Sequence, residues 1–353
     1  MSVYWSDGIG EIEPYVPGEQ PRDQKYVKLN TNENPYPPSP WVLEAIRKAV
    51  DASLRLYPDP SGEALRTTIA AKYFLPRERI FLGNGSDEIL AFAFAAFLDH
   101  EEPLLHPDIS YSFYPVYARF FGLKSRTIAV RPDFSLPVED FLVPNGGIVI
   151  ANPNAPTGEF LPLSRIRLLL DYNLAAGRVV IVDEAYVDFG GETASPLVAE
   201  YPNLLVVHTL SKSKSLAGLR VGYAFGQEEL IAGLERVKSS VNSYTVDRLA
   251  LAGAAAAFED EPYYRETRAR VMATREWATA ELESLGFTVL PSTANFVFVS
   301  HRTAKAERIY AELKARGVLV RYFRRPRIDN HLRVSIGTDA EMLVLIEKLK
   351  EIL

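Results

Sequence analysis

Residues 179–186 read VVIVDEAY, so four β-branched side chains in succession run directly into two carboxylates. Near-continuous Val and Ile are typical of a strand that is buried on both faces of a parallel sheet. Three more apolar runs pass into polar residues in the same way: IFL into GNGSDE at 80–88, IVIA into NPNAPTG at 148–158, and LLVVH into TLSKSKSLAGLR at 204–220. Because ligands of an open parallel sheet bind beyond the carboxyl ends of its strands, these four polar clusters predict one shared site.

The segments around these strands have helical patterns, and a fifth strand is predicted at 221–225. The helices are expected at 41–53, 63–73, 86–98 and 163–176. Strands that alternate with helices indicate an α/β domain built on a mostly parallel sheet. We expect this large domain to span residues 41–246.

The sequence pattern differs at the two ends of the chain. From about residue 247 long helices extend to 285, and strands then alternate with helices: strands at 295–300, 318–321 and 332–336, and helices at 303–316 and from 339. This order indicates a smaller α+β domain at 247–353. Residues 1–40 are rich in Pro, Gly and Asn, which cannot support a long helix, so we expect an arm that joins the small domain.

Composition narrows the class of protein. The 353 residues carry 45 acidic and 39 basic side chains, a formal net charge of −6, and 47% of them are hydrophobic. This acidic balance gives no overall attraction to nucleic acid or to anionic membranes, so neither is expected as a partner. The longest apolar run, 89–98, is far below the roughly 20 residues that a membrane span needs. With no signal-like start, we expect a soluble, cytoplasmic protein.

The residue types at the strand ends indicate the chemistry. With no cysteine, thiolate metal sites and cysteine nucleophiles are excluded, and no motif of the H-E-x-x-H kind predicts a metal. Asp183 ends a strand that is expected to be fully buried, so its carboxylate needs a partner. That partner is either an arginine or a cationic heterocyclic nitrogen. Tyr186, three positions on, can reach the same ligand.

Two clusters suit an anion. In GNGSDE, Ser86 and Asp87 fall in the first turn of a helix, whose free amides bind phosphate, although an ordinary helix cap would also explain this motif alone. Thr209, Ser211 and Arg220 form a second cluster around Lys212, a lysine that can be desolvated and form an imine with a carbonyl. A Schiff-base lysine, an aspartate for a pyridinium nitrogen and a phosphate cradle together specify pyridoxal phosphate.

With these motifs the sequence resembles the fold-type I pyridoxal-phosphate aminotransferases, and among them the histidinol-phosphate aminotransferases. The segments LNTNENP, RLYPD, GNGSDEIL, SYSFYP, NPNAPTG, VDEAYVDF, TLSKSKSLAGLRVGYA and HLRVSIG occur in the family's order over nearly the whole chain. The resemblance implies a mostly parallel seven-stranded sheet in the large domain, pyridoxal 5′-phosphate as cofactor, and a homodimer whose subunits share their active sites.

The resemblance also implies roles for individual residues. Lys212 would form the Schiff base and move the substrate proton, Asp183 would hold the pyridinium nitrogen, and Tyr186 would bind the phenolic oxygen. The cofactor phosphate and ring would be bound by the remaining cofactor residues: Ser86, Asp87, Tyr111 stacked on the ring, Thr209, Ser211, Arg220, and Tyr57 of the partner subunit. Substrate would be bound by Tyr15, Asn32, Arg321 and Arg333.

The sequence departs from the family pattern at two positions. The family usually has an asparagine directly before PTG, where this chain has Ala155, so we expect the preceding Asn154 to bind the phenolic oxygen. An aromatic residue usually stands two positions after the Schiff-base lysine, where this chain has Lys214. We expect the Lys214 ammonium to point to solvent.

Five arginines, Arg321, Arg324, Arg325, Arg327 and Arg333, gather near the end of an otherwise acidic chain. Arg321 and Arg333 match the family positions that bind the anionic group of the substrate, and a guanidinium suits phosphate or carboxylate bidentately. We therefore expect transfer of the amino group of L-histidinol phosphate to 2-oxoglutarate, a step of histidine biosynthesis.

Other functions remain open at this point. The same arginines could bind a carboxylate, as in an aromatic amino-acid aminotransferase, or a phosphate, as in a lyase similar to threonine-phosphate decarboxylase. Two further classes are disfavoured. A nicotinamide-dependent dehydrogenase would need a third glycine in GNGSDE, and the sensor domain of a transcriptional regulator would need a DNA-binding module that the motif positions leave no room for.

Overall fold

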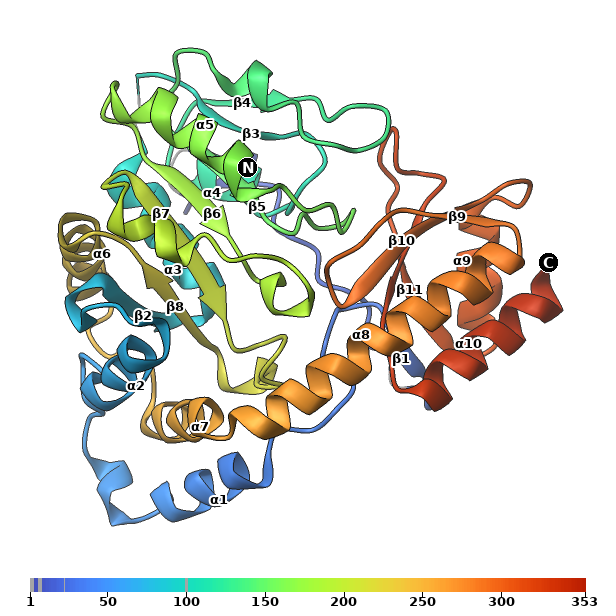
Figure 1. Cartoon of the computed structure of the whole chain (residues 1–353), viewed down its shortest axis with the longest axis horizontal. Helices are drawn as coiled ribbons and strands as arrows, with labels where there is room; N and C mark the ends of the chain where they lie inside the picture. The colour runs from blue at the N-terminus through green and yellow to red at the C-terminus, as the bar shows by residue number, and fades with distance from the viewer. Residues whose placement is uncertain (1–2, 6–7, 22, 99–100) are drawn as a thin grey trace.

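The computed structural model describes residues 3–5, 8–21, 23–98 and 101–353, which form two sheets covered by helices (Figure 1). The larger sheet has seven strands in the order β2-β8-β7-β6-β5-β3-β4. Their bounds are β2 Ile80–Asn84, β3 Leu104–Pro107, β4 Ser125–Ile128, β5 Ile148–Ala151, β6 Val180–Asp183, β7 Leu204–Thr209 and β8 Val221–Phe225. Neighbours from β4 to β7 are parallel, and β8 alone runs antiparallel to both of its neighbours. The predicted α/β class with a mostly parallel seven-stranded sheet is confirmed.

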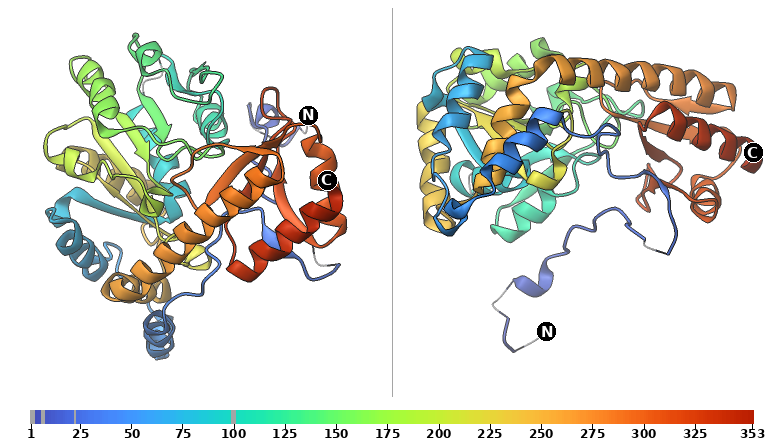
Figure 2. Two further views of the ribbon diagram at one scale, coloured as in Figure 1. Left: turned by 45° about the vertical axis from the view of Figure 1, so that its right-hand side comes forward. Right: turned by 90° about the horizontal axis from the view of Figure 1, so that it is seen from below.

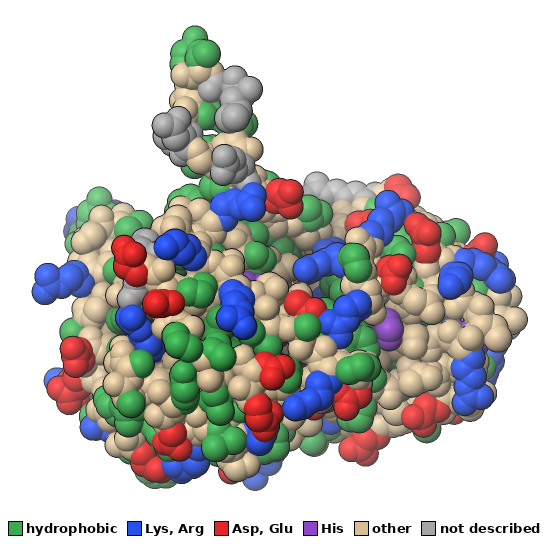
Figure 3. Space-filling view, turned by 90° about the horizontal axis from the view of Figure 1, so that it is seen from above, with side chains coloured by type: hydrophobic (Ala, Val, Ile, Leu, Met, Phe, Trp, Pro, Cys, Tyr) green, Lys and Arg blue, Asp and Glu red, His purple; other side chains and the backbone are tan. Residues whose placement is uncertain are grey.

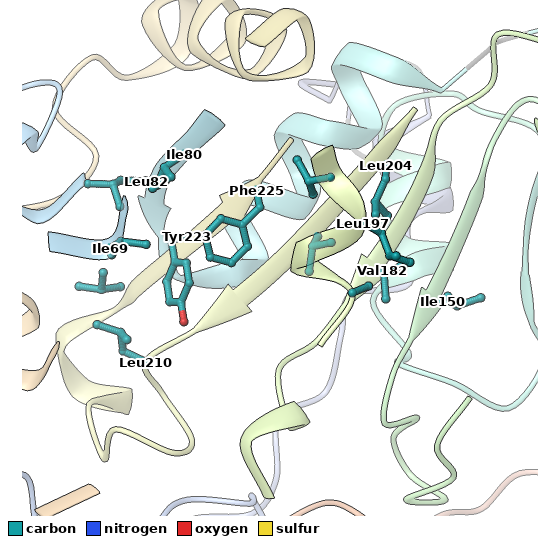
Figure 4. Close-up of a cluster of buried hydrophobic side chains, with 14 of the residues drawn as sticks. Ile69, Ile80, Leu82, Ile150, Val182, Leu197, Leu204, Leu210, Tyr223 and Phe225 are labelled. Carbon is teal, nitrogen blue, oxygen red and sulfur yellow. The ribbon is translucent and has the colours of Figure 1, made fainter. Parts of the chain in front are cut away.

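Helices cover both faces of this sheet because its strands are apolar on both sides. In β6, Val180 and Val182 belong to one buried cluster and Ile181 to the other, as expected when side chains alternate between faces. Figure 4 shows members of the first cluster on neighbouring strands. Helices α2 (Glu63–Tyr73), α5 (Leu163–Leu174) and α7 (Arg248–Glu259) supply residues to this cluster, and α3 (Gly85–Phe97), α4 (Tyr114–Phe120) and α6 (Glu228–Val241) supply the other.

The smaller sheet has five strands in the order β1-β11-β12-β10-β9. Their bounds are β1 Val27–Leu29, β9 Phe287–Val289, β10 Phe296–His301, β11 Val318–Tyr322 and β12 Leu332–Ser335. Strand β1 pairs in parallel with β11, while the other pairs are antiparallel. Helices α8 (Glu261–Ser284), α9 (Ala306–Ala315) and α10 (Asp339–Ile352) pack on the sheet around one apolar cluster.

Two segments join the two sheets. Helix α8 runs from the side of the larger sheet, where it follows α7, to the smaller sheet (Figure 1). The N-terminal segment joins the smaller sheet as β1 and continues to α1 (Pro40–Ala49) beside the larger sheet, while its short 3-10 helix extends away from the body (Figure 2). The arm thus contributes one strand to the sheet that is otherwise built from the C-terminal part of the chain.

Short 3-10 helices occupy several connections: Ile9–Glu11, Ala52–Arg55, Arg77–Arg79, Val138–Phe141, Val187–Phe189, Ser195–Ala199 and Ala217–Leu219. On the face in Figure 3, basic and acidic side chains are interspersed. No helix in the described ranges is long and apolar enough to cross a bilayer.

The sequence pattern does not predict β1, β3, β4 or β9. Strand β3 reads LLHP and β4 reads SRTI, and three of the four β4 side chains are exposed. Such short segments lack a clear apolar period, so their pairing with neighbouring strands makes them strands. The expected helix at 41–53 ends at Ala49, and Asp51 then caps a separate 3-10 turn by accepting from the Ser53 amide.

Candidate active site

A cavity of about 1310 Å³ lies at the carboxyl ends of β5, β6 and β7, with the smaller sheet and the N-terminal segment as its other walls. It gathers residues that are far apart in the chain. Those expected at the site and found on its walls are Tyr15, Asn32, Ser86, Asp87, Tyr111, Asp183, Tyr186, Thr209, Ser211, Lys212, Arg220, Arg321 and Arg333. The predicted convergence of the four strand-end clusters is therefore found in one cavity.

Asp183 is the last residue of β6, in the interior of the large sheet, and is 5% exposed. The Tyr114 hydroxyl donates to its Oδ2 at 3.1 Å, and the Ala185 amide donates to its Oδ1 at 3.2 Å. Burial raises the pKa of Asp183 to about 6 in spite of these two bonds. Because both partners are neutral, a cation that enters the cavity at this carboxylate would favour its ionised form.

Tyr186 lies on the same wall and is oriented by the N-terminal segment. Asn32 Nδ2 donates to the Tyr186 hydroxyl oxygen at 3.1 Å, while the Ser335 hydroxyl donates to Asn32 Oδ1 at 2.8 Å. The Asn295 side chain donates to the Asn32 carbonyl at 3.0 Å. Since the Asn32 amide nitrogen is a donor only, the Tyr186 hydroxyl proton remains available to a ligand.

An anion site lies at the start of α3, which begins at Gly85 directly after β2. Arg220 Nη2 donates to Asp87 Oδ2 at 3.0 Å, and the Tyr111 hydroxyl donates to Asp87 Oδ1 at 2.7 Å. The free amides and the dipole of a helix start attract anions, and Arg220 adds a positive charge. Thr209 and Ser211, whose hydroxyls are 2.9 Å apart, complete a set of donors that suits a phosphate.

Lys212 lines the cavity three residues after the end of β7. Its Nζ lies 5.6 Å from the centre of the Tyr186 ring and 3.4 Å from the Thr31 carbonyl oxygen. Asn34 Nδ2 donates to the Lys212 carbonyl at 3.0 Å, so the backbone is held, while among the described residues the amine makes one long hydrogen bond. An amine in this position can react with a carbonyl group of a ligand.

The two expected substrate arginines stand on neighbouring strands, with Arg321 of β11 directly opposite Arg333 of β12. Arg321 donates to the Val16 and Pro17 carbonyls at 3.1 and 3.3 Å, and Arg333 donates to the Asn30 carbonyl at 3.1 Å. Burial lowers the pKa of Arg333. Its buried Nε has no hydrogen-bond partner among the described residues, so an anionic ligand would satisfy it.

The remaining arginines and Tyr15 lie around this pair. Arg324 contacts Glu307 at 3.2 Å, Arg327 contacts Asp108 at 2.6 Å, and Arg325 lines the cavity. Tyr15 stacks on Phe113 with ring centres 4.4 Å apart and lies 6.3 Å from Tyr111. The N-terminal arm is thereby held over the cavity.

Two expected site residues do not line the cavity. Asn154 is buried, donates to the Ile109 carbonyl and to Thr157, and accepts from Ser110, so its amide is used by its own loop and by the segment that follows β3. Ala155, not Asn154, reaches the cavity wall. Tyr57 is 75% exposed and stacks on Tyr244 with ring centres 4.5 Å apart.

The expectation that Lys214 points to solvent is wrong. Its side chain is buried against the Tyr264 ring, with Nζ 4.3 Å from the ring centre, and Nζ also contacts Glu261 at 3.2 Å. Burial, with repulsion from Lys72, lowers its pKa to about 8. An aromatic ring and a carboxylate replace the water that a lysine normally needs, and neither partner is apparent from the local sequence.

The sequence reasoning missed Tyr114 and Asn34, which hold Asp183 and the Lys212 backbone. Both lie within motifs quoted above, SYSFYP and LNTNENP, but neither motif shows which member touches the site. In the part of the chain that the structure describes, no three His, Cys, Asp or Glu side chains gather as ligands for a metal ion.

Comparison with known proteins gives the family. The sequence profile described as aminotransferase class I and II matches residues 24–349. The chain belongs to this family. Histidinol-phosphate aminotransferase of Clostridium acetobutylicum is 55% identical over 351 residues, which are 99% of this chain and 99% of that protein. The enzyme of the same name from Clostridium beijerinckii is 55% identical over 100% of this chain and 98% of its own.

A solved structure extends the likeness to the fold. Histidinol-phosphate aminotransferase from Sinorhizobium meliloti, in complex with pyridoxal-5′-phosphate, superposes with a TM-score of 0.90 at 24% identity, covering 100% of this chain and 98% of that one. At this level of identity the match shows that the aminotransferase has the same fold. Sequence and fold thus agree on a fold-type I aminotransferase.

The cavity of this aminotransferase fits pyridoxal phosphate. Asp183 is a buried carboxylate without a cationic partner among the described residues, which suits a ring nitrogen that carries a proton. The start of α3 with Arg220 suits the phosphate, and the Lys212 amine lies on the same cavity wall. A carboxylate for the ring, a cradle for the phosphate and an amine for the aldehyde are therefore all present.

Proposed function

We propose that this aminotransferase moves the amino group of L-histidinol phosphate to 2-oxoglutarate, which gives imidazole-acetol phosphate and L-glutamate, and that it serves histidine biosynthesis. The observation that carries the proposal is the pair Arg321 and Arg333, which face the same cavity as Lys212. Two adjacent guanidinium groups suit the phosphate of the donor and, in the second half of the reaction, a carboxylate of the acceptor. The whole-length identity of 55% to enzymes of this name supports it.

Each site residue has a task in this reaction. When bound, pyridoxal phosphate supplies a ring that accepts the electron pair left at the donor's α-carbon after proton loss. Asp183 keeps the ring nitrogen protonated, and Tyr186 donates its hydroxyl proton to the phenolic oxygen. Lys212 Nζ takes the proton from the α-carbon of the donor and later gives a proton to the α-carbon of the acceptor, which leaves as L-glutamate.

The remaining residues orient cofactor and substrate. The amides of Ser86 and Asp87, with Thr209, Ser211 and Arg220, hold the cofactor phosphate. Tyr111 stacks on the ring. Tyr15, on the arm held against Phe113, covers the substrate and excludes water from the cavity. Asn32, in addition to its proposed contact with substrate, orients the Tyr186 hydroxyl.

The proposal includes a homodimer with shared active sites, in which Tyr57 binds the cofactor phosphate of the partner subunit. Tyr57 is exposed and absent from the walls of the cavity in its own chain, yet its backbone carbonyl accepts from Arg248 at 3.2 Å and its ring stacks on Tyr244. An exposed aromatic ring fixed in this way suits a contact with a second chain. Nearby exposed apolar side chains, Trp41, Leu43, Leu54 and Leu56, support an interface on this side. The cytoplasmic location expected from the sequence remains a prediction.

The deciding experiment compares histidinol phosphate with phenylalanine as donors, each with 2-oxoglutarate, on the cofactor-loaded protein. A preference of about a hundredfold or more in kcat/KM for histidinol phosphate would support the proposed donor. Similar values would mean a broad aromatic aminotransferase. Release of carbon dioxide without formation of glutamate would mean a lyase.

A variant tests the proposed role of Lys212. Lys212→Ala is expected to lower kcat by about three orders of magnitude or more and to remove the visible absorption of the lysine-linked cofactor, because the proton carrier and the amine are lost together. Lys350→Ala, which changes an exposed lysine of α10, serves as the matched control. Substantial transamination by Lys212→Ala would contradict the mechanism.

A further inference from the structure

Ser213 and Lys214, the two residues after Lys212, belong to a closed ring of side-chain contacts. Lys214 Nζ contacts Glu261 at 3.2 Å, and Glu261 also accepts from Arg268. Arg268 contacts Asp188 at 3.3 Å, and Asp188 accepts from the Ser213 hydroxyl. Because Ser213 and Lys214 are consecutive, this chain of contacts begins and ends at one peptide group, directly after Lys212.

Lys214 also connects this ring of contacts to the junction between helices α7 and α8. Its Nζ donates to the carbonyl of Ala257, in the last turn of α7, at 3.1 Å, and lies 4.3 Å from the ring centre of Tyr264 in α8. A cation is favoured at a helix C-terminus, where carbonyl groups lack partners, and over an aromatic face. These contacts offset part of the cost of burying the ammonium, although burial still lowers the pKa of Lys214 to about 8.

The four consecutive residues of this loop point in two directions. Ser211 and Lys212 line the cavity, whereas Ser213 and Lys214 do not and are 2% and 4% exposed. Asn34 Nδ2 donates to the Lys212 carbonyl at 3.0 Å and to the Ser213 carbonyl at 3.4 Å. The direction of the Lys212 side chain thus depends on where the backbone of 213–214 is held.

We propose that Lys214 is a positioning residue, whose ammonium, fixed at the α7–α8 junction, holds the backbone so that Lys212 Nζ meets the aldehyde carbon of the cofactor. The inference rests on the proposed function of Lys212. In the step concerned, Lys212 Nζ forms a carbon–nitrogen double bond with that carbon, and the aldehyde oxygen leaves as water. Lys214 touches neither reacting atom and acts only through the backbone.

Lys214→Met tests this role because Met fills a similar volume without the charge. Glu261 keeps its bonds to Lys72 and Arg268, so the variant leaves no buried carboxylate without a partner. Lys72→Met is the matched control, since it removes a different cation from the same Glu261 but lies in α2, away from the Lys212 loop.

The measurement is made without any amino donor, so it does not depend on which donor is correct. Cofactor-free protein is mixed with pyridoxal phosphate, and the growth of the visible band reports the rate at which Lys212 links to it. Lys214→Met is expected to slow this rate about tenfold, because small displacements of a reacting group have large effects, whereas Lys72→Met stays within about twofold of the parent protein. Thermal unfolding of the cofactor-free variants confirms that they are folded.

Ser213→Ala provides a second variant. It removes the hydrogen bond from the Ser213 hydroxyl to Asp188, at the other end of the ring of contacts. It is expected to slow the linking rate in the same direction, and it supplies the test if Lys214→Met does not fold. An unchanged linking rate in the folded Lys214→Met protein, or equal slowing by Lys72→Met, would overturn the proposal. Loss of the visible band in the parent protein would instead contradict the proposed function of Lys212.

Discussion

At the scale of single residues, Asp183 illustrates how a buried group depends on its ligand. The carboxylate lies in the interior of the large sheet and accepts from two neutral donors, the Tyr114 hydroxyl and the Ala185 amide. Burial raises its pKa from 3.8 to about 6, so the cofactor-free protein contains a carboxylate that is costly to ionise. A protonated ring nitrogen would remove that cost.

This argument predicts how stability depends on pH without cofactor. Between about pH 4 and 6 the folded protein retains a proton on Asp183 that the unfolded chain releases, so this group lowers the free energy of unfolding as the pH rises through that window. At pH 7.5, Asp183→Asn is therefore expected to raise the free energy of unfolding of the cofactor-free protein, by up to about 3 kcal/mol, with a smaller gain near pH 4. Urea unfolding at fixed protein concentration measures this. An equal difference at both pH values would contradict it.

At the scale of elements, the anion site depends on how closely β8 passes the start of α3. A Cβ built on Gly222 of β8 would lie 2.5 Å from the Gly85 carbonyl carbon and 2.5 Å from the Ser86 nitrogen. Both are backbone atoms, which cannot rotate away as a side chain can. Glycine is required here because the antiparallel pairing of β2 and β8 places Gly83 opposite Gly222, next to the helix start.

Gly222→Ala is therefore expected to displace the first turn of α3. We expect it to lower the free energy of unfolding by about 1–3 kcal/mol, as for other overpacked sites, and to weaken binding of pyridoxal phosphate. Urea unfolding and titration of the cofactor-free protein with pyridoxal phosphate measure the two effects. Gly218→Ala is the control because a Cβ there meets no atom within 4 Å. Cofactor affinity unchanged by Gly222→Ala would contradict this account of the anion site.

For some helices and strands, the local sequence pattern is sufficient to predict the bounds. The predicted helix 63–73 and strands 148–151 and 221–225 have the observed bounds, because each is a periodic or β-branched segment between clear breaks. The reversed direction of β8 is not apparent from its residues, since parallel and antiparallel strands in the interior of a sheet have the same apolar pattern. The proposed division of the chain at residues 40 and 246 stays a prediction.

At the scale of the whole molecule, the site needs parts from distant segments. The arm supplies Tyr15 and Asn32, the large sheet supplies Asp183 and Lys212, and the smaller sheet supplies the arginine pair. Strand β1 and helix α8 connect these parts. Strand β1 belongs to the smaller sheet and α8 packs on it, and from each of them the polypeptide leads to an element beside the larger sheet. The residues proposed for the substrate and those proposed for the cofactor thus line one cavity.

The proposed dimer leads to a complementation test. Tyr57→Ala and Lys212→Ala homodimers are each expected to be impaired, because every site lacks one residue. In a mixed dimer, one site has both original residues and the other has neither. After subunit exchange in an equal mixture, activity should recover to about a quarter of the parent value, because half of the dimers are mixed and half of their sites are intact.

The outcome decides whether Tyr57 acts across the interface. No recovery, in a mixture shown to contain mixed dimers, would place Tyr57 outside the partner's site. A mixture of Lys212→Ala with Asp183→Asn is the matched control, since both residues lie in the same cavity of one chain and no mixed dimer restores a complete site.

The sequence by itself determined that polar clusters with Asp183 and Lys212 follow apolar strands, because this pattern depends on neighbours within a few residues. Tertiary structure alone decided that Lys214 is buried beside Tyr264, that Asn154 bonds to the segment after β3, and that part of the N-terminal arm becomes a strand. The physical reason is that burial and partner choice depend on segments far apart in the chain. A lysine or an asparagine has the same local sequence whether water or another helix covers it.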